Sequence, residues 1–292
     1  MIILRRILKF ALIPAISLYR SILLRFDKNI FATLFNLKSI ILLSPARIYW
    51  NDDIFVVKDK KIDNFEYRFR HQTQGNMAYE FGIIKRAQDL ANCYFLNEIE
   101  FKDDDVFLDC GANVGDLKIW FELQNIAIEY IGFEPSPIEF NCLKENVSPS
   151  VVHNIGLWKE SGELEFFVSS QGADSSLIEP PSFDTQIKVP VGTLDSYVDT
   201  KVKLLKLEAE GAEPEILEGL GEKLNCIEYI SADLGFERGA NCESTLVPVT
   251  NFLLERGFEL VNVSHGRVCA LFKNKYIEST IAMDENTSSK NH

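Results

Sequence analysis

The chain has 292 residues, of which 46% are apolar and 25% charged, and its net charge is −13. This length fits one large or two small domains with a substantial core, and the composition excludes a largely disordered protein. The acidic excess argues against nucleic-acid binding, because a negative surface repels the phosphate backbone. Six cysteines stand without a Cys-x-x-Cys pair or a Cys/His cluster, which indicates reduced thiols in the cytoplasm and argues against structural zinc.

Residues 1–50 differ from the rest of the chain in charge. They hold eight basic residues and one acid, about +7, which leaves about −20 for the remainder. Cations alternate with apolar residues, as in helices on anionic lipid, but the run between Lys9 and Arg20 contains Pro14 and has about half the ~20 residues a span needs. The same pattern is also possible for a signal peptide, but no small-x-small cleavage site follows Tyr19. We expect a helical segment that caps the next domain or contacts the inner face of a membrane peripherally.

Residues 51–100 predict a small connecting region. Two short apolar runs, 54–57 and 65–70, indicate a hairpin. The pattern over 80–97 favours a helix that leads into the core of the following domain, residues 101–275.

The apolar run 106–109 enters a loop marked by Gly111 and Gly115. Glycines at these positions let the backbone pass close under a ligand, and a helix entered from such a loop presents unpaired N–H groups. Asp109 would repel a pyrophosphate but tolerate the ammonium and sulfonium charges of S-adenosylmethionine. We predict that this segment binds S-adenosylmethionine, with Asn113 at its methionine part; a purely structural strand–turn–helix corner is the alternative.

The next apolar run, 130–133, delivers Glu134 to the same edge of a sheet. A carboxylate at this point suits the two hydroxyls of a ribose. The dinucleotide fingerprint Gly-x-Gly-x-x-Gly is absent, since the chain reads Asp-x-Gly-x-x-x-Gly.

Strand and helix patterns alternate through the rest of the chain, which predicts an α/β fold with a doubly wound sheet. The helical patterns cover 114–123, 137–146, 214–220 and 244–256, and the strand candidates are 106–109, 130–133, 151–157, 204–207, 229–233, 260–263 and 268–272.

Three further segments complete the pattern. The last two strands are joined tightly through His265 and Gly266, which indicates an antiparallel hairpin. A strand pair, 164–168 and 186–191, flanks a polar loop that could form a lid or substrate wall. Residues 276–292 indicate a polar, frayed tail.

Four motifs in this order give the chain a resemblance to the FkbM-type S-adenosylmethionine-dependent methyltransferases, over roughly residues 76–272. The family usually has Asp and Val where this chain has Glu208 and Ala209. The motifs are Phe107-Leu108-Asp109-Cys110-Gly111-Ala112-Asn113-Val114-Gly115, Phe133-Glu134-Pro135, Gly192-Thr193-Leu194-Asp195 and Leu205-Lys206-Leu207-Glu208-Ala209-Glu210-Gly211-Ala212-Glu213.

The resemblance implies a class I methyltransferase (Rossmann-like) fold with a seven-stranded, mostly parallel sheet, helices on both faces and here an N-terminal helical extension. It also implies O-methylation of a hydroxyl on a sugar, a glycan or a secondary metabolite. In this fold the third strand borders the adenine, so Asn154 is expected to reach it. Methyl transfer is an in-line displacement in which positioning supplies much of the acceleration, and the acceptor hydroxyl must lose a proton.

Acids crowd the ends of the strands 204–207 and 229–233. Such crowding raises pKa values and favours a base near neutrality, so we predict catalytic roles for four residues: Lys206, Glu208, Glu210 and Asp233. Lys206 lies in an apolar strand and is expected to pair with one of the acids, in a catalytic or a purely structural role. Glu213 precedes Pro214 and could simply cap a helix.

Several alternatives remain beside methyl transfer. Glu237 and Arg238 could bind a polyol or form a surface ion pair, and the acids could hold magnesium, although no metal is predicted. An NAD-dependent oxidoreductase would need a third glycine and a catalytic pair that are not seen. A noncatalytic, membrane-attached binding protein of the same fold would not need Asp109, Glu134 and Glu210. The sequence does not indicate an oligomeric state.

Overall fold

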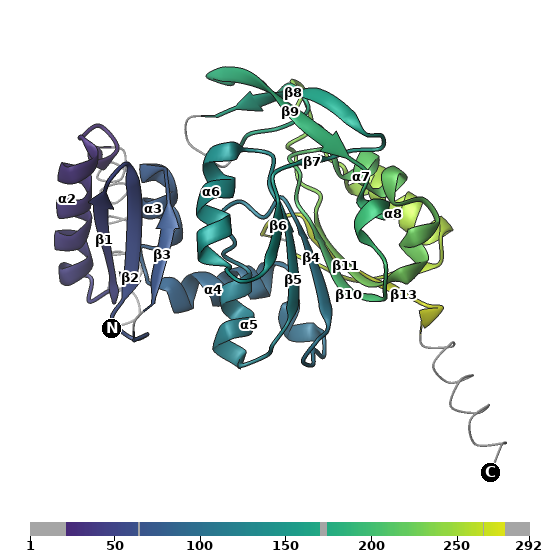
Figure 1. The fold of residues 1–292 in the computed structure, drawn as a ribbon, viewed down its shortest axis with the longest axis horizontal. Helices are drawn as coiled ribbons and strands as arrows, with labels where there is room; N and C mark the ends of the chain where they lie inside the picture. The colour runs from purple at the N-terminus through teal and green to yellow at the C-terminus, as the bar shows by residue number, and fades with distance from the viewer. Residues whose placement is uncertain (1–21, 64, 170–173, 265, 278–292) are drawn as a thin grey trace, which may run out of the picture. The chain divides into compact units, whose positions relative to one another are not determined.

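The computed structural model describes residues 22–63, 65–169, 174–264 and 266–277 (Figure 1). The chain divides into two compact units, residues 1–86 and residues 87–292. The predicted lipid-facing stretch before residue 22, His265 and most of the predicted tail 276–292 lie outside the described residues. Among the helices of the described part, none is both long and apolar enough to cross a membrane.

The described part of the first unit contains the helices α2 and α3 and a three-stranded antiparallel sheet in the order β1-β2-β3. Asp27 caps α2, because its Oδ1 accepts hydrogen bonds from the N–H groups of Asn29 and Ile30 at 3.0 and 3.1 Å. The elements are α2 (Lys28–Ile41), β1 (Ala46–Asn51), β2 (Ile54–Asp59), β3 (Glu66–Phe69) and α3 (Gln72–Ala78).

An aromatic core joins α2 to this sheet. The Phe55 ring packs against Phe31 at 5.5 Å and stacks on Phe69 at 5.1 Å between ring centroids. All three side chains are fully buried, which stabilises the unit by removing their apolar area from water.

The antiparallel pair β2–β3 confirms the predicted hairpin. The strand β1 is a correction, because residues 46–50 were expected to be helical. Ala46 and Ile48 are buried while Tyr49 is exposed. This alternation is typical of a strand, and the segment contains Ile, Tyr and Trp, which favour strands over helices. The helix predicted over 80–97 is shorter, since α4 (Ile83–Cys93) is followed by a 3₁₀ turn, η1 (Leu96–Glu98).

A seven-stranded sheet forms the centre of the second unit, in the order β12-β13-β11-β10-β4-β5-β6. β13 runs antiparallel to both of its neighbours and the remaining pairs are parallel, which confirms the expected class I methyltransferase sheet. The strands are β4 (Val106–Cys110), β5 (Glu129–Phe133), β6 (Val151–His153), β10 (Val202–Leu207), β11 (Ile227–Asp233), β12 (Phe258–Val263) and β13 (Cys269–Asn274).

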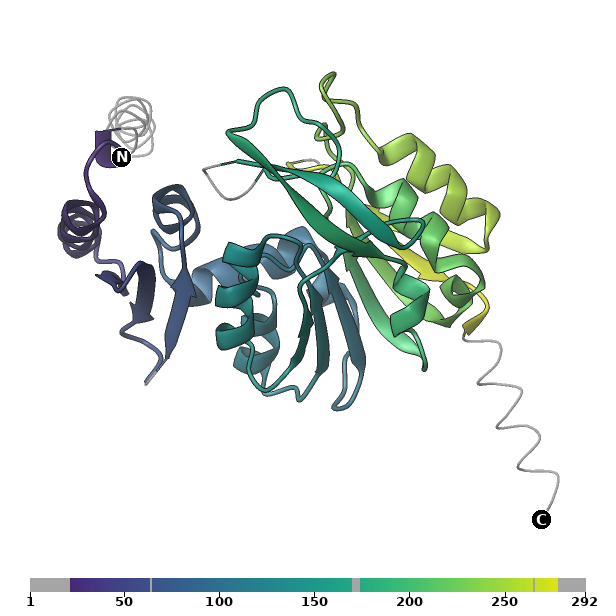
Figure 2. The same cartoon turned by 45° about the horizontal axis from the view of Figure 1, so that its top comes forward.

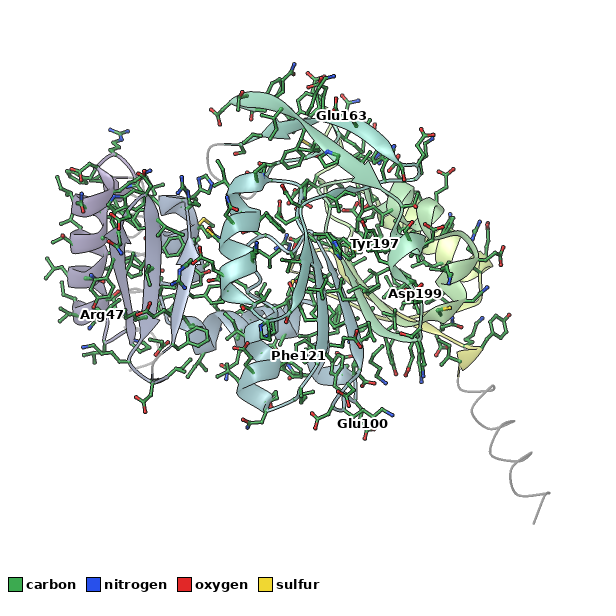
Figure 3. The ribbon with its side chains drawn as sticks, in the orientation of Figure 1. Arg47, Glu100, Phe121, Glu163, Tyr197 and Asp199 are labelled. Carbon is green, nitrogen blue, oxygen red and sulfur yellow. The ribbon has the colours of Figure 1, made fainter. Side chains whose placement is uncertain are left out.

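Helices cover both faces of this sheet (Figure 1). The alternation along β4 shows why: Leu108 packs into the core cluster that contains Ile216 of α7, whereas Phe107 faces the other way, with its ring 5.3 Å from that of Phe121 on α5. Phe121 lies between its helix and the sheet in Figure 3. The helices are α5 (Lys118–Gln124), α6 (Pro137–Asn146), α7 (Glu213–Leu220) and α8 (Leu246–Glu255), with 3₁₀ turns η2 (Leu194–Tyr197) and η3 (Gly221–Cys226).

The strand predicted over 151–157 is wrong as a single element. Its first part is β6, but Gly156–Leu157 forms β7, which pairs with β9 (Thr185–Gly192) in a separate sheet of order β7-β9-β8. Asn154 and Ile155 interrupt the strand between the two sheets. The pair β8 (Gly162–Val168) and β9 is antiparallel and confirms the predicted one, and Figure 2 shows this small sheet as a layer of its own.

Candidate active site

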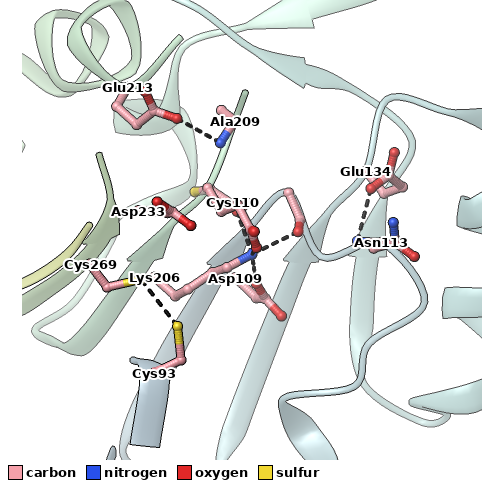
Figure 4. Close-up of polar contacts among 12 residues, drawn as sticks. Cys93, Asp109, Cys110, Asn113, Glu134, Lys206, Ala209, Glu213, Asp233 and Cys269 are labelled. Carbon is pink, nitrogen blue, oxygen red and sulfur yellow. Dashed lines mark hydrogen bonds and ion pairs between the residues drawn. The ribbon is translucent and has the colours of Figure 1, made fainter. Parts of the chain in front are cut away.

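Four polar or glycine positions meet at the carboxyl edge of the large sheet. Leu207 lies opposite Cys110 and Ala232, and Cys110 lies opposite Phe133. The next residue on each strand is therefore, across β11, β10, β4 and β5, Asp233, Glu208, Gly111 and Glu134. The structure thus brings most of the predicted site residues to one edge (Figure 4).

The loop after β4 depends on left-handed backbone. Gly111, Asn113 and Gly115 have φ values of 72°, 49° and 90°. A Cβ on Gly111 would lie 1.8 Å from the carbonyl oxygen of Glu208, so any side chain here would clash with the end of β10. The glycine is thus required by close packing inside the protein, a reason that the sequence did not reveal.

Glu134 connects this loop to the start of α6. Its Oε2 accepts a hydrogen bond from the Asn113 N–H and its Oε1 accepts one from the Ser136 N–H, both at 2.8 Å. Burial, followed by repulsion from Glu139, raises the pKa of Glu134 to about 8. A carboxylate has about four acceptor sites, so two remain for ribose hydroxyls, and the residue fits its predicted role.

Asn154 holds the end of β5. Its Nδ2 donates to the carbonyl oxygens of Glu134 and Pro135 at 2.8 and 3.1 Å. The side-chain amide is used to fix the backbone that carries Glu134, so contact with an adenine stays a prediction.

Asp109 and Lys206 form a buried ion pair between β4 and β10. Lys206 Nζ lies 3.1 Å from Asp109 Oδ1, with both side chains at most 3% exposed, and Tyr130 donates to Asp109 Oδ2 at 2.8 Å. Lys206 also lies 3.1 Å from Glu208 and donates to the carbonyl oxygens of Cys110 and Gly111 at 3.0 and 2.7 Å. Burial opposes the charge, but the two acids raise the pKa of Lys206 above its ordinary value. The predicted pairing of Lys206 with an acid is confirmed.

Arg267 is a residue of this site that the sequence interpretation missed. It pairs with Glu208 and with Asp233, and its guanidinium lies 3.9 Å from Glu237. Although burial opposes it, Lys206 and Arg267 lower the pKa of Glu208 to about 2. The sequence did contain a signal, because Arg267 follows Gly266 in the tight turn before β13. The hairpin places this turn at the edge of the sheet where the acids lie.

Glu210 differs from its neighbour Glu208. Within the described residues its carboxyl group makes no hydrogen bond or ion pair, and its backbone has a φ of 50°. Burial, then Glu237, Glu208 and Asp174, raise the pKa of Glu210 to about 10, and burial and Asp233 raise that of Glu237 to about 7. The edge therefore holds two acids with raised pKa values that together retain a proton near neutral pH.

The side chains of Glu213 and Arg238 bind other residues of the protein. Glu213 Oε1 accepts from the N–H groups of Ala209 and Gly211 at 2.9 and 3.2 Å, so it fixes the loop after β10. The two terminal guanidinium nitrogens of Arg238 donate hydrogen bonds to the carboxylate of Glu215, at 2.8 and 2.7 Å. Of the two alternatives for Arg238, the ion pair is the one observed.

The donor set at this edge fits S-adenosylmethionine. Glu134 retains acceptor sites for a ribose, and the loop from Gly111 to Gly115 turns beside it. No cluster of three or more His, Cys, Asp or Glu residues suited to a metal ion occurs among the described residues.

Comparison with known proteins identifies the domain. The pattern of the methyltransferase FkbM domain matches residues 109–260. Methyltransferase 1 of Beauveria bassiana is 26% identical over 173 residues, covering 49% of this chain and 69% of that protein. The hexuronic acid methyltransferase AglP of Haloferax volcanii is 27% identical over 143 residues, covering 46% of this chain and 58% of that protein.

A third relative matches a shorter stretch. The 31-O-demethyl-FK506 methyltransferase FkbM of Streptomyces tacrolimicus is 33% identical over 69 residues, which is 24% of this chain and 26% of that protein. The chain thus spans 69%, 58% and 26% of the lengths of these three relatives.

Proposed function

The chain belongs to the FkbM family of S-adenosylmethionine-dependent methyltransferases, and we propose that it methylates a hydroxyl of a neutral, polyhydroxylated acceptor, a sugar, glycan or secondary metabolite. The observation that carries this proposal is the contrast at the carboxyl edge between arginines that are paired with acids and Glu210, whose carboxyl group has no partner among the residues that the structure describes. The names of AglP and FkbM, a hexuronic acid methyltransferase and a 31-O-demethyl-FK506 methyltransferase, support an oxygen acceptor.

Glu210 is the proposed base. The cofactor supplies a methyl group on a sulfonium, and the acceptor oxygen must lose its proton as it attacks. Raised pKa values let Glu210 and Glu237 share one proton near neutral pH, and passage of that proton from Glu210 to Glu237 leaves Glu210 ionised and able to take the proton of the hydroxyl. Lys206 and Glu208 hold each other in place, which supports a positioning role for both.

A neutral acceptor follows from the charges at this edge. The two arginines there, Arg238 and Arg267, are already paired with Glu215 and with Glu208 and Asp233. A carboxylated acceptor would meet Glu210 and Glu237 without an uncommitted guanidinium from either arginine, and like charges repel. Hydroxyls, by contrast, donate hydrogen bonds to carboxylates.

The first test is calorimetric titration with S-adenosylhomocysteine, with NAD in parallel. We expect binding of S-adenosylhomocysteine alone; binding of NAD alone would favour an oxidoreductase. Transfer of labelled methyl from S-adenosylmethionine is then measured on paired glucosides and glucuronides. Preference for the glucuronides, or transfer to nitrogen in an amine series, would contradict the proposal.

For residues 1–50 we propose peripheral contact with an anionic membrane surface. The end of α2 and the turn after it expose large apolar side chains, with Ile41 72% and Leu43 91% exposed, and residues 1–50 carry about +7. Full-length protein is floated with anionic vesicles. Leu43→Glu should reduce flotation, whereas Val247→Glu, at a similarly exposed position of α8, should not; equal flotation of all three proteins would contradict the contact.

A further inference from the structure

Two cysteines from distant parts of the second unit lie in sulfur contact. Cys93 ends α4 and Cys269 begins β13, and their Sγ atoms are 3.1 Å apart (Figure 4). They are separated by 176 positions in the sequence, so the contact is produced by the fold. Cys269 is buried and Cys93 is partly exposed, which gives a small oxidant access to one member of the pair.

The surroundings of the pair favour thiolate chemistry at Cys93. The hydrogen-bond contact with Cys269 lowers the pKa of Cys93 against the effect of burial, and Arg267 nearby acts in the same direction. Since the thiolate is the reactive form, Cys93 is the member expected to react first.

The same contact has other conceivable uses that the structure does not support. A metal site would need a third ligand, and the described part of the chain holds no group of three or more His, Cys, Asp or Glu residues suited to a metal. Apolar packing alone requires no access from solvent, whereas Cys93 is partly exposed and can be reached by a small oxidant.

We propose that Cys93 and Cys269 are a redox modification site that forms an intramolecular disulfide under a peroxide. The Cys93 thiolate attacks hydrogen peroxide, the O–O bond breaks, and a sulfenic acid forms as hydroxide leaves and is protonated. The Cys269 thiol then attacks that sulfur, the S–O bond breaks, and the displaced hydroxide takes the proton of Cys269 and leaves as a second water. Two thiols are oxidised by two electrons and one peroxide is reduced to two waters.

The disulfide would fasten the end of α4 to the hairpin that carries the Arg267 cluster. Cys269 lies opposite Asp233 in the sheet, and Arg267, two positions before Cys269, pairs with Asp233 and Glu208. The bond also closes a long loop that contains strands β4 to β12, which restricts the unfolded chain and stabilises the folded one. Oxidation should therefore raise the melting temperature, and dithiothreitol should reverse the change.

The experiment treats the full-length protein with hydrogen peroxide, counts thiols after denaturation and maps linked peptides by mass spectrometry. We expect the count to fall from six to four, a Cys93–Cys269 cross-linked peptide and a reversible rise in melting temperature. Cys93→Ser should remove all three changes. Cys226→Ser, a matched change at another partly exposed cysteine, should keep them.

Each result bears on the proposal. Linkage through the exposed Cys242, sulfinic acid at Cys93 without linkage, or unchanged thiols would overturn it. If Cys93→Ser fails to fold, the peptide map of the unmodified chain still decides. S-adenosylhomocysteine affinity of reduced protein is measured separately, so failure of the disulfide is distinguishable from failure of the methyltransferase proposal.

Discussion

The two halves of the carboxyl edge use their carboxylates differently. After β5, Glu134 accepts hydrogen bonds from the backbone N–H groups of Asn113 and Ser136, and its other acceptor sites are the ones proposed to hold the ribose. On β10 and β11, Glu208 and Asp233 are neutralised by Lys206 and Arg267, while the carboxyl group of Glu210 has no ion-pair partner in the described part of the chain. The difference indicates a division of labour, with ribose recognition on one side and proton transfer on the other.

Lys206 connects the halves, because it contacts Asp109 on β4 and Glu208 after β10. Lys206→Met should therefore have the largest effect. It leaves Asp109 buried without a counterion, and we expect a loss of about 3–5 kcal/mol in the free energy of unfolding, measured by urea denaturation. Lys188→Met removes an exposed pair with Glu163 and should cause no measurable change. Equal stabilities of the two variants would show that the buried pair is unimportant.

Glu134→Ala tests the cofactor half. Loss of the carboxylate removes the proposed ribose contacts, and S-adenosylhomocysteine should bind about 1.5–3 kcal/mol more weakly by calorimetry. Glu129→Ala is the matched control, because Glu129 is exposed at the opposite end of the same strand. Unchanged affinity of Glu134→Ala would remove this residue from the site.

Glu210→Gln tests the acceptor half through stability. The pKa of Glu210 in the folded protein, about 10, exceeds its ordinary value, so its contribution to stability is full at acidic pH and is lost as the pH rises toward 10. The variant should be about 1–2 kcal/mol more stable than the unmodified protein at pH 8 and no more stable at pH 4. Glu215→Gln, which breaks the ion pair with Arg238, should be destabilising at pH 8. A destabilised Glu210→Gln would mean that Glu210 has a partner.

The pH dependence of cofactor affinity should show the smallest effect. The ionised form of Glu134 is the better acceptor for ribose hydroxyls, and burial raises its pKa to about 8. Affinity for S-adenosylhomocysteine should rise by at most about ten-fold between pH 7 and pH 9. The rise should be absent in Glu134→Ala; if it persists there, another group causes it.

Much of the fold was predictable because apolar runs mark buried parallel strands, and such runs coincide with β4, β5, β10 and β11. The division of residues 151–157 between two sheets could not be predicted, because it depends on the pairing of β7 with β9, which is distant in the sequence. The motif residues predicted which acids meet at the carboxyl edge of the sheet. Arg267 was not predicted, because only the register of the β12–β13 hairpin brings it to these acids. The ion-pair partners of Glu208 likewise depend on tertiary contacts.

The most direct test of the division of labour measures cofactor affinity and methyl transfer in Glu210→Gln. We predict S-adenosylhomocysteine affinity within about two-fold of the unmodified protein, with methyl transfer to the accepted glycoside reduced by at least about a hundred-fold, as expected for loss of a base. Affinity and transfer lost together would contradict the account, because Glu210 would then support the cofactor half as well.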